Sequence, residues 1–351
     1  MKKSISFIWV LTLLSGPVSA SAFTAVKDTL PSIPGEHNYI YVRTPLEENE
    51  EKNYDEITFY DGLGRELDFA QSYGANRTAI FIADHHLIEY DSLGRKEKQW
   101  ITAPTSFSYM APEDLKNGIL WDYHDAGKRS YLQTNYESSP LNRITEQYGV
   151  GDAWGNHPAR MEYLTNIPAD SLRCSLYLID DNDALIRRGD YRSGELQVTK
   201  ATDEDGRPTY TFVDKQGRTL LTRIGRGNQQ ADTYFVFDRF GRIRYVLPPM
   251  INDEISAGNL DLYAYQYLYD SFGRCISKKL PSCAAIRYVY DKADRVILSQ
   301  NGNQSQKKEW TFTFYDNQGR LSLTGLCSFN DPPSLDNSIV RAYRTTAEKD
   351  G

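Results

Sequence analysis

The sequence predicts a mainly β protein, in which stacked β-hairpins form a long antiparallel sheet that coils. Three observations predict this fold class. A five-residue turn motif recurs along the chain, the segments before it alternate in polarity, and aromatic residues make up 13% of the chain, including 25 Tyr. Aromatic residues favour strands, and glycine-containing segments favour turns. Self-similarity of this kind is typical of a repeat protein.

The turn motif reads Asp-x-x-Gly-Arg and occurs in seven intact copies. Their Asp, Gly and Arg residues are Asp61, Gly64 and Arg65; Asp91, Gly94 and Arg95; Asp203, Gly206 and Arg207; Asp214, Gly217 and Arg218; Asp238, Gly241 and Arg242; Asp270, Gly273 and Arg274; and Asp316, Gly319 and Arg320. Degenerate copies lie at residues 125–128, 139–143 and 291–295. In most copies an aromatic residue precedes the acid; these residues are Tyr60, Tyr90, Phe237, Tyr269, Tyr290 and Tyr315.

Each residue of the motif has a structural role in a hairpin turn. The Asp side chain accepts a backbone N–H two residues on, and Gly supplies the positive φ of a short loop. Asn142 and Asp294 replace Gly in two degenerate copies, and both residue types tolerate that conformation. The Arg opens the returning strand. A β-branched residue in place of Gly273 is therefore expected to strain its turn.

The segments before the turns follow the period of two that a strand requires. Tyr263, Tyr265, Tyr267 and Tyr269 are expected to form one all-tyrosine strand face, and Trp310, Phe312 and Phe314 another. A single hairpin is barely stable in water, so neighbouring hairpins must pair side by side. Because strands twist, the resulting sheet is expected to coil.

Residues 1–22 are expected to be a secretory signal peptide. Two lysines precede an apolar stretch at residues 5–14, and small residues follow it. The stretch is too short for a membrane-spanning helix, so cleavage after Ala20 or Ala22 is expected. The mature chain is therefore expected in the periplasm, at the cell surface or outside the cell, without a transmembrane segment.

The density of the motif divides the rest of the chain into five segments. They are an irregular leader at residues 23–37, an N-terminal region with the first repeats at 38–165, less regular connecting strands at 166–200, a dense repeat block at 201–330 and a polar tail at 331–351. Within the N-terminal region, Pro112 and the two acids after it are expected to open a short helix.

No metal site is expected. His85 and His86, with Asp84 and Glu89 nearby, are the densest cluster of possible ligands, but adjacent residues on a strand point to opposite faces. The acidic stretches at residues 180–183 and 203–206 do not fit a calcium loop and are interpreted as turns.

An enzyme is not expected either. The sequence contains no nucleophile elbow, phosphate loop or dinucleotide fingerprint, so neither a catalytic residue nor a cofactor is predicted. The formal net charge of −7 disfavours nucleic acid as a partner.

The four cysteines are Cys174, Cys275, Cys283 and Cys327. An exported protein can keep disulfides. Cys275 starts one strand and Cys283 precedes the next, so the two are expected to face each other and form a disulfide. The alternative is that these residues are reduced, buried thiols.

The repeated aromatic-Asp-x-x-Gly-Arg motif resembles the YD repeat of RHS proteins. More specific strings resemble the N-terminal region of RHS proteins from Bacteroidetes. They are Phe-Tyr-Asp-Gly-Leu-Gly-Arg at residues 59–65, Ser-Pro-Leu-Asn-Arg at 139–143, Gly-Asp-Ala-Trp at 151–154, Tyr-Val-Leu-Pro-Pro at 245–249 and Tyr-Val-Tyr-Asp-Lys-Ala-Asp-Arg at 288–295. The resemblance covers about residues 38–330.

The resemblance implies a secreted β-scaffold. In that family the repeats spiral into a hollow shell, which often encloses or displays a variable C-terminal domain, commonly a toxin. This chain has few repeats and shows no separate C-terminal domain, so the toxin function is not carried over. The chain is expected to be a truncated copy, a split gene product or an N-terminal module that works with a partner. The implied partner is a C-terminal RHS or toxin portion. The alternative is a secreted adhesin that binds surface glycans with its Tyr-rich face.

Overall fold

The computed structural model describes residues 38–46, 52–75, 82–106, 110–122, 129–225, 230–251 and 254–328. The expected signal peptide, the leader, the shortened motif copy at 125–128 and the polar tail lie outside the described residues. The chain divides into two compact units. The first holds residues 1–85 and 103–115, and the second holds residues 86–102 and 116–351.

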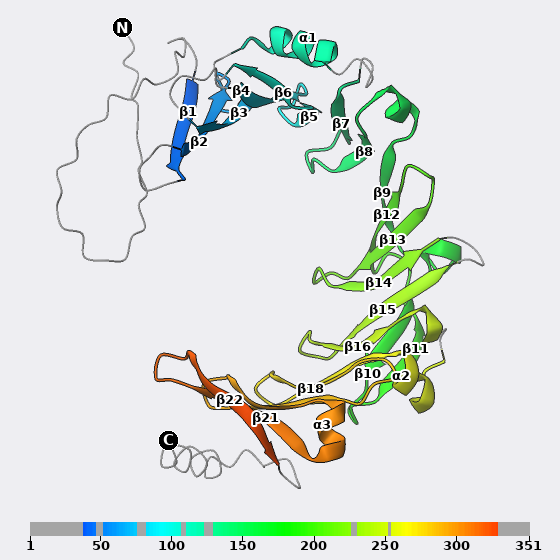
Figure 1. The fold of residues 1–351 in the computed structure, drawn as a ribbon. Helices are drawn as coiled ribbons and strands as arrows, with labels where there is room; N and C mark the ends of the chain where they lie inside the picture. The colour runs from blue at the N-terminus through cyan, green and yellow to red at the C-terminus, as the bar shows by residue number, and fades with distance from the viewer. Residues whose placement is uncertain are drawn as a thin grey trace, which may run out of the picture. The chain divides into compact units, whose positions relative to one another are not determined.

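The first unit contains an antiparallel meander of three strands (Figure 1). These are β1 (Asn38–Pro45), β2 (Lys52–Tyr60) and β3 (Glu66–Ala75). The first half of β4 (Ile82–Tyr90) pairs with β6 (Ala103–Ser106).

Strand β2 shows the predicted alternation. Ile57 and Phe59 are buried, and Ala70 on β3, which lies opposite Ile57, is buried as well. The helix α1 (Pro112–Asp122) begins at Pro112, as the sequence predicted. Its apolar residues Leu115 and Ile119 are buried.

The second unit is one long antiparallel ladder (Figure 1). It begins where residues 88–90 of β4 pair with β5 (Lys96–Trp100), which in turn pairs with β7 (Tyr131–Tyr136). The strands that follow are β8 (Ile144–Tyr148), β9 (Ala159–Thr165), β12 (Gln197–Thr202), β13 (Pro208–Val213), β14 (Thr219–Ile224), β15 (Ala231–Phe237), β16 (Ile243–Leu247), β17 (Tyr265–Tyr269), β18 (Cys275–Lys279), β19 (Ile286–Tyr290), β20 (Val296–Gln300), β21 (Glu309–Tyr315) and β22 (Leu321–Ser328). Each pairs with the next in this order, so the predicted fold class is confirmed.

Neighbouring strands run in opposite directions, so successive turns lie at opposite ends of the strands. All but one of the described motif copies in this unit close hairpins at the same end, which we call the turn edge. The turn edge consists of residues 91–95, 137–143, 214–218, 238–242, 270–274, 291–295 and 316–320. Each of these hairpins has a register shift beside the residue before the acid. Such bulges increase the local twist.

A separate hairpin, β10 (Ser175–Ile179) and β11 (Leu185–Asp190), packs on the sheet. The larger core cluster of the described residues lies between the two layers. Tyr177 of the hairpin belongs to the same cluster as Phe212 and Val236 of the sheet. The less regular segment between β9 and β12 therefore supplies one side of the core.

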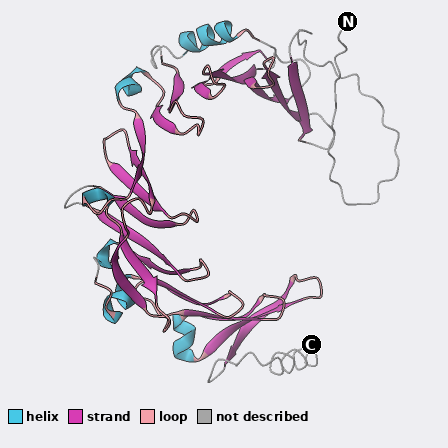
Figure 2. Ribbon diagram, turned by 180° about the vertical axis from the view of Figure 1, so that it is seen from behind, coloured by secondary structure: helices cyan, strands magenta, loops and turns pink. Residues whose placement is uncertain are grey.

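Short helices fill the connections between strands (Figure 2). They are η2 (Asp152–Asn156), η3 (Asp170–Leu172), η5 (Pro249–Ile251), α2 (Ala257–Tyr263) and α3 (Gly302–Lys307). The start of α3 is a capping box, in which Asn301 and Gln304 satisfy each other's backbone N–H groups.

One expected strand face is corrected by the structure. Tyr263 ends α2 and does not lie on the strand with Tyr265, because the strand β17 begins only after the buried residue Ala264. The second expected face is found on β21, where Trp310 and Phe312 belong to a smaller core cluster.

Candidate functional site

The turn at residues 270–274 shows how the motif builds a hairpin. Oδ1 of Asp270 accepts the backbone N–H groups of Phe272 and Arg274, at 3.0 and 2.9 Å. Oδ2 accepts Nε of Arg274 at 2.7 Å. Gly273 has φ +85°, a conformation that L side chains rarely adopt. The motif is therefore a closed unit in which Asp, Gly and Arg each have one defined role.

The same arrangement recurs in both units. The Arg Nε lies 2.7–2.8 Å from the Asp Oδ2 in the turns that begin at Asp61, Asp91, Asp214, Asp238, Asp291 and Asp316. The predicted glycine substitutes are confirmed, because Asn142 has φ 54° and Asp294 has φ 59°.

These hydrogen bonds also lower the pKa values of the turn carboxylates. Burial raises the pKa of Asp270, but the backbone and side-chain hydrogen bonds from Arg274 lower it by more, so the pKa lies below its usual value. The pKa is lowered in the same way at Asp91, Asp214, Asp238 and Asp291. The turn carboxylates are thus held in their charged form and are not poised to act as general acids.

Five turns of the turn edge are each linked to a following hairpin by a cation–π contact. The guanidinium of a motif Arg lies over the ring of the aromatic residue that precedes the next acid. The Arg Cζ to ring-centre distances are 4.7 Å for Arg95 and Tyr136, 5.0 Å for Arg218 and Phe237, 4.7 Å for Arg242 and Tyr269, 5.1 Å for Arg274 and Tyr290, and 4.9 Å for Arg295 and Tyr315.

A hydrogen bond accompanies most of these contacts. The tyrosine hydroxyl donates to the carbonyl of the residue that follows the preceding motif Arg. These pairs are Tyr136 and Lys96 at 3.0 Å, Tyr269 and Ile243 at 2.9 Å, Tyr290 and Cys275 at 2.8 Å, and Tyr315 and Val296 at 3.0 Å. Phe237 makes the ring contact without a hydroxyl. We call this set of contacts the arginine–aromatic ladder, and it explains why an aromatic residue precedes the acid.

The turn at residues 137–143 is a longer variant. The sequence placed its start at Ser139, but Glu137 closes it, because Arg143 donates from Nε and Nη2 to the Glu137 carboxylate at 2.7 and 2.6 Å. The side-chain hydrogen bond from Arg143 is the main reason that the pKa of Glu137 falls to about 2. Arg143 also lies 4.4 Å from the Tyr163 ring centre, so the ladder continues through this turn.

The copy at residues 203–207 lies at the opposite end of the strands. It joins β12 to β13, and the insert between β9 and β12 occupies the turn edge instead. The side chain of Arg207 is 76% exposed and contacts Asp205 at 3.5 Å. This copy makes the backbone turn but takes no part in the ladder.

The acidic run at residues 180–183, expected as a turn, forms a turn of the same type as the motif, which the sequence did not indicate. Oδ1 of Asp180 accepts the N–H groups of Asn182 and Ala184 at 2.9 and 2.8 Å, and Asp183 takes the glycine position with φ 67°. The interpretation of this acidic run as a turn is confirmed. Ala184 stands where the motif has Arg, which is why the pattern did not reveal a repeat.

Two buried arginines of the sheet bind the segment before the β10–β11 hairpin and the turn of this hairpin. Arg223 pairs with Asp232, with Nε 2.7 Å from Oδ1, and its Nη1 donates to the carbonyls of Ser171 and Arg173 at 3.0 and 2.9 Å. Arg244 donates to Asp183 at 2.7 Å.

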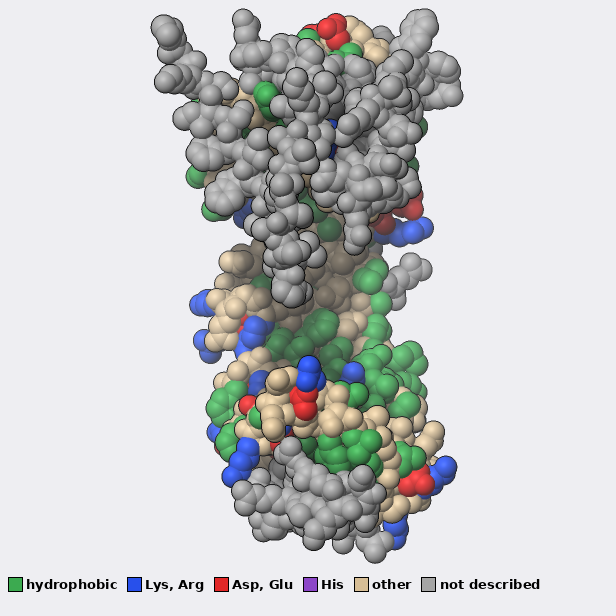
Figure 3. Space-filling model, turned by 60° about the vertical axis from the view of Figure 1, so that its left-hand side comes forward, with side chains coloured by type: hydrophobic (Ala, Val, Ile, Leu, Met, Phe, Trp, Pro, Cys, Tyr) green, Lys and Arg blue, Asp and Glu red, His purple; other side chains and the backbone are tan. Residues whose placement is uncertain are grey.

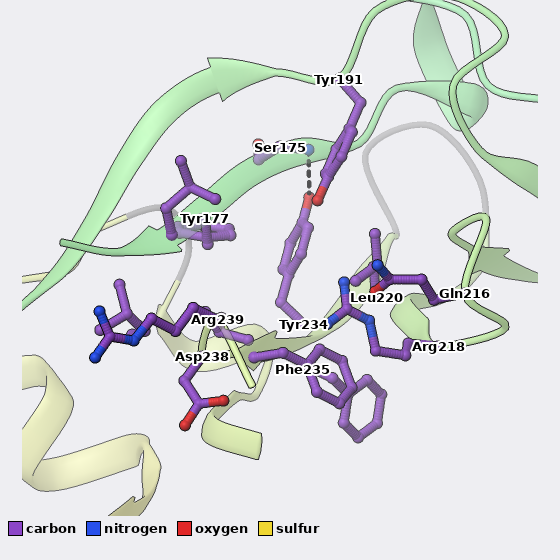
Figure 4. A pocket seen from close by; sticks show the side chains of 14 residues that line it. Ser175, Tyr177, Tyr191, Gln216, Arg218, Leu220, Tyr234, Phe235, Asp238 and Arg239 are labelled. Atoms are coloured by element: carbon purple, nitrogen blue, oxygen red, sulfur yellow. Dashed lines mark hydrogen bonds between the residues drawn. The ribbon is translucent and has the colours of Figure 1, made fainter. Parts of the chain in front are cut away.

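A cavity of about 310 Å³ lies between this hairpin and the sheet (Figure 4). The Tyr234 hydroxyl points toward Ser175 and accepts its backbone N–H at 3.3 Å, with Tyr191 beside it. Burial raises the pKa of Tyr191 and of Tyr234 to about 12. Both hydroxyls therefore stay protonated at neutral pH, and neither can serve as a general base.

His85 is a core residue of the first unit. Its Nδ1 lies 2.5 Å from Oδ2 of Asp68, and both side chains are buried. Within the residues that the structure describes, no group of three or more His, Cys, Asp or Glu is placed to hold a metal ion. His85 is therefore held in the core by Asp68 of β3.

The expected disulfide between Cys275 and Cys283 is wrong, because both thiols are free. Ser277 of β18 lies opposite Arg287 of β19, and continuing this register puts Cys275 opposite Val289. Cys283 lies in the turn before β19, six residues away along the strand direction, which is about 20 Å. Cys174 and Cys327 are free thiols as well.

The surface of the larger unit is mixed in character. Figure 3 shows apolar side chains interspersed with charged ones of both signs on one face. Several exposed apolar residues of this unit occupy the third position of the motif turns; these are Leu93, Leu141, Phe240 and Phe272, and Leu63 takes the same position in the first unit. Among the helices of the described residues, none is both long and apolar enough to cross a membrane.

The comparisons with known proteins agree with this fold. The model of the family described as "Domain of unknown function (DUF6443)" matches residues 37–165. Crystal structures of TcdB2-TccC3, alone, with TEV and with Cdc42, match with TM-scores of 0.50, 0.51 and 0.52 at 13–14% sequence identity. No curated protein matches.

The likeness to TcdB2-TccC3 covers 80% of this chain but only 13% of those chains. It shows a shared fold, which is a long antiparallel β-sheet built from hairpins. The chain thus spans a small part of the length of the structures it resembles.

Proposed function

We propose that this chain is an exported, non-enzymatic β-scaffold of the RHS type and forms the N-terminal portion of a larger cell-surface or toxin-like protein. The arginine–aromatic ladder is the observation that carries this proposal. In every turn of the turn edge the acid pairs with the arginine of the same turn. Five of these arginines also lie over the aromatic residue before the next acid. The fold shared with TcdB2-TccC3 supports the same role.

The chemistry of the described residues supports a scaffold over an enzyme. The carboxylates with lowered pKa values are paired with arginines inside turns, and the buried tyrosines of the cavity stay protonated. A search for hydrolase activity with the purified chain tests this part, and turnover that survives further purification would contradict it.

Export is tested by fractionation. A chain with residues 1–22 should reach the periplasm, the cell surface or the medium, and a chain that lacks them should stay in the cytoplasm. Equal distribution of the two chains would contradict the export proposal.

The proposed place in a larger protein is tested by DNA sequence. The reading frame beyond the codon for Gly351 should contain more Asp-x-x-Gly-Arg copies, either directly or in an adjacent gene. An unrelated gene after a stop codon would instead favour a stand-alone scaffold.

Glycan binding is the second candidate function. Tyr265 of the Tyr-rich strand is exposed and is free to stack on a sugar ring. Tyr269 is occupied by Arg242 in the ladder, so the stacking surface is smaller than the sequence suggested. A glycan array with wild type and Tyr265→Ala tests this function, and the absence of binding removes it.

A further inference from the structure

The strand β22 is the last described strand of the ladder and has one open edge. Its only partner among the described strands is β21. Exposed edge strands are usually protected by charges, proline or shortness. The sequence of β22, Leu-Ser-Leu-Thr-Gly-Leu-Cys-Ser, contains no charged residue and no proline over eight residues. Such an edge is a template for another strand.

The side chains of β22 differ in exposure from those of an equivalent internal strand. Leu298, the third residue of β20, is 8% exposed, because β21 pairs beside it. Leu323, the third residue of β22, is 47% exposed. Leu321 and Leu326 are exposed as well. These leucines occupy positions that the next hairpin would cover.

The motif arginine of the last described turn also differs from the other arginines of the turn edge. The side chain of Arg320 is 74% exposed, although its Nε still pairs with Asp316 at 2.7 Å. The side chain of Arg295 is 34% exposed and lies over Tyr315 of the following hairpin. No aromatic ring of the described residues lies over Arg320. The arginine of a ladder contact is therefore present at this turn without its aromatic partner.

We propose that the open edge of β22 binds the first strand of a further YD-type hairpin that lies outside residues 1–351. The incoming strand runs antiparallel to β22 and ends in Tyr-Asp or Phe-Asp. Its ring lies over Arg320, and a tyrosine hydroxyl donates to the Leu321 carbonyl, as Tyr315 does to Val296. The occupant follows from the established interface, since the same contacts join the hairpin β15–β16 to β17–β18, β17–β18 to β19–β20, and β19–β20 to β21–β22.

The strand β1 of a second copy of this chain does not fit as the incoming strand. The start of β1 lies beside the turn end of β2, because Asn38 pairs with Tyr60. Antiparallel pairing of β1 with β22 would therefore bring Pro45 and Leu46, and no aromatic ring, beside Arg320. The chemistry of the edge selects a strand that ends in an aromatic residue and an acid.

The inference rests on the proposed function as an RHS-type scaffold, but its test is separate from the tests of export and catalysis. The probe is a fluorescent hairpin peptide with the sequence of residues 309–328, which carries Leu323→Lys and Leu326→Lys so that its own second strand cannot recruit another copy. Fluorescence anisotropy measures its binding to the full chain.

The peptide should bind the wild-type chain saturably. Arg320→Ala in the chain, or Tyr315→Leu in the peptide, should weaken binding about 3- to 30-fold, the range expected for a lost cation–π contact. Tyr315→Phe in the peptide should weaken binding less. Arg207→Ala is the matched control, because Arg207 is an equally exposed motif arginine at the other end of the strands, and it should leave binding unchanged.

Three results would overturn the proposal. The first is no binding, or binding that Arg320→Ala does not weaken although the variant melts at the wild-type temperature. The second is a dimer of the chain that Leu323→Lys disrupts and that excludes the peptide, which would make a second copy the occupant. The third is binding only by a chain without residues 329–351, which would assign the edge to this chain's own terminal segment. None of these results would bear on export or on the absence of catalysis.

Discussion

The guanidinium carbon of Arg274 lies 5.1 Å from the ring centre of Tyr290, a residue of the following hairpin. The same guanidinium holds Asp270 in its own turn through Nε and donates from Nη1 to the carbonyl of Asp291 at 3.0 Å. One side chain thus closes one turn and fixes the position of the next. The stability of the sheet should therefore depend on contacts between turns as well as on the hydrogen bonds between strands.

Substitutions of Tyr290 should separate the two parts of this contact. Tyr290→Phe removes the hydrogen bond to the Cys275 carbonyl and should lower the free energy of unfolding by about 0.5–1.5 kcal/mol. Tyr290→Leu also removes the ring and should cost roughly 0.5–1 kcal/mol more. Urea unfolding measures both values. The natural Phe237 shows that a ring alone is compatible with the ladder, so equal values for the two variants would argue against a role for the ring.

The turn glycine can be tested at Gly273. Gly273→Ala places a Cβ at φ +85° and should destabilise the chain by about 1–2 kcal/mol through backbone strain, since no backbone or carbon atom crowds the new methyl group. Gly258→Ala in α2 is the control, because a Cβ there meets nothing within 4 Å and no positive φ is required. Thermal melts should show a lower transition for the first variant only. Identical melting temperatures would mean that the turn relaxes.

The turn carboxylates predict a loss of stability in acid. The pKa of Asp270 in the folded chain lies below the ordinary value of 3.8, so its contribution is present above pH 3.8 and is lost as the pH falls toward the folded pKa. The same sign holds for the other paired turn aspartates, and for Glu137, whose pKa is about 2. The urea midpoint should therefore fall between pH 5 and pH 3.

Asp270→Asn provides the control for this pH dependence. It removes one titrating group, so the midpoint should be lower at pH 6 but should vary less between pH 5 and pH 3. An unchanged slope would show that the carboxylates of the turns do not govern the acid response.

Arg223 should be the principal anchor of the β10–β11 hairpin. Arg223→Ala leaves Asp232 and two backbone carbonyls without their donor and should cost about 3–5 kcal/mol, as the loss of one partner of a buried ion pair does. Hydrogen exchange should rise first in the hairpin. Arg160→Ala, which removes an exposed pair with Glu146, should cost less than about 1 kcal/mol. If the two variants were equally stable, the anchor would lie elsewhere.

The four thiols should react in an order set by exposure. Cys283 is exposed and should be labelled first by a thiol reagent, whereas burial raises the pKa of Cys174 to about 12 and should protect it until the chain unfolds. Mass spectrometry of the denatured, alkylated chain should find four modified cysteines without prior reduction. A chain that carries only two labels before reduction and four after it would support a disulfide, and labels missing from Cys275 and Cys283 would identify that pair.

The sequence predicted the turns well because each turn is a local structure. The Asp, Gly and Arg of one copy lie within five residues, and even the substitutes Asn142 and Asp294 were recognised, since the backbone conformation alone restricts that position. The run at Asp180 was expected as a turn but not as a turn of the motif type, because Ala184 takes the place of the arginine while the backbone hydrogen bonds remain.

Features that depend on the register of distant segments were not predictable in this way. The proposed disulfide failed because the strand and turn lengths between Cys275 and Cys283 place them at opposite ends of a hairpin. The copy at Asp203 resembles the others in sequence, but a preceding insert moves it to the other end of the strands. The ladder itself was visible only as an unexplained preference for an aromatic residue before the acid.

The ladder also makes the number of hairpins adjustable. The carbonyl after Arg274 and the carbonyl after Arg295 accept equivalent tyrosine hydroxyls, from Tyr290 and Tyr315. Removing residues 275–295 would connect Arg274 directly to β20 and bring Tyr315 over it, with the same two contacts restored. Genes for such chains can therefore gain or lose whole repeats by recombination without creating a new kind of junction, so scaffold length can evolve separately from the chemistry that holds it together.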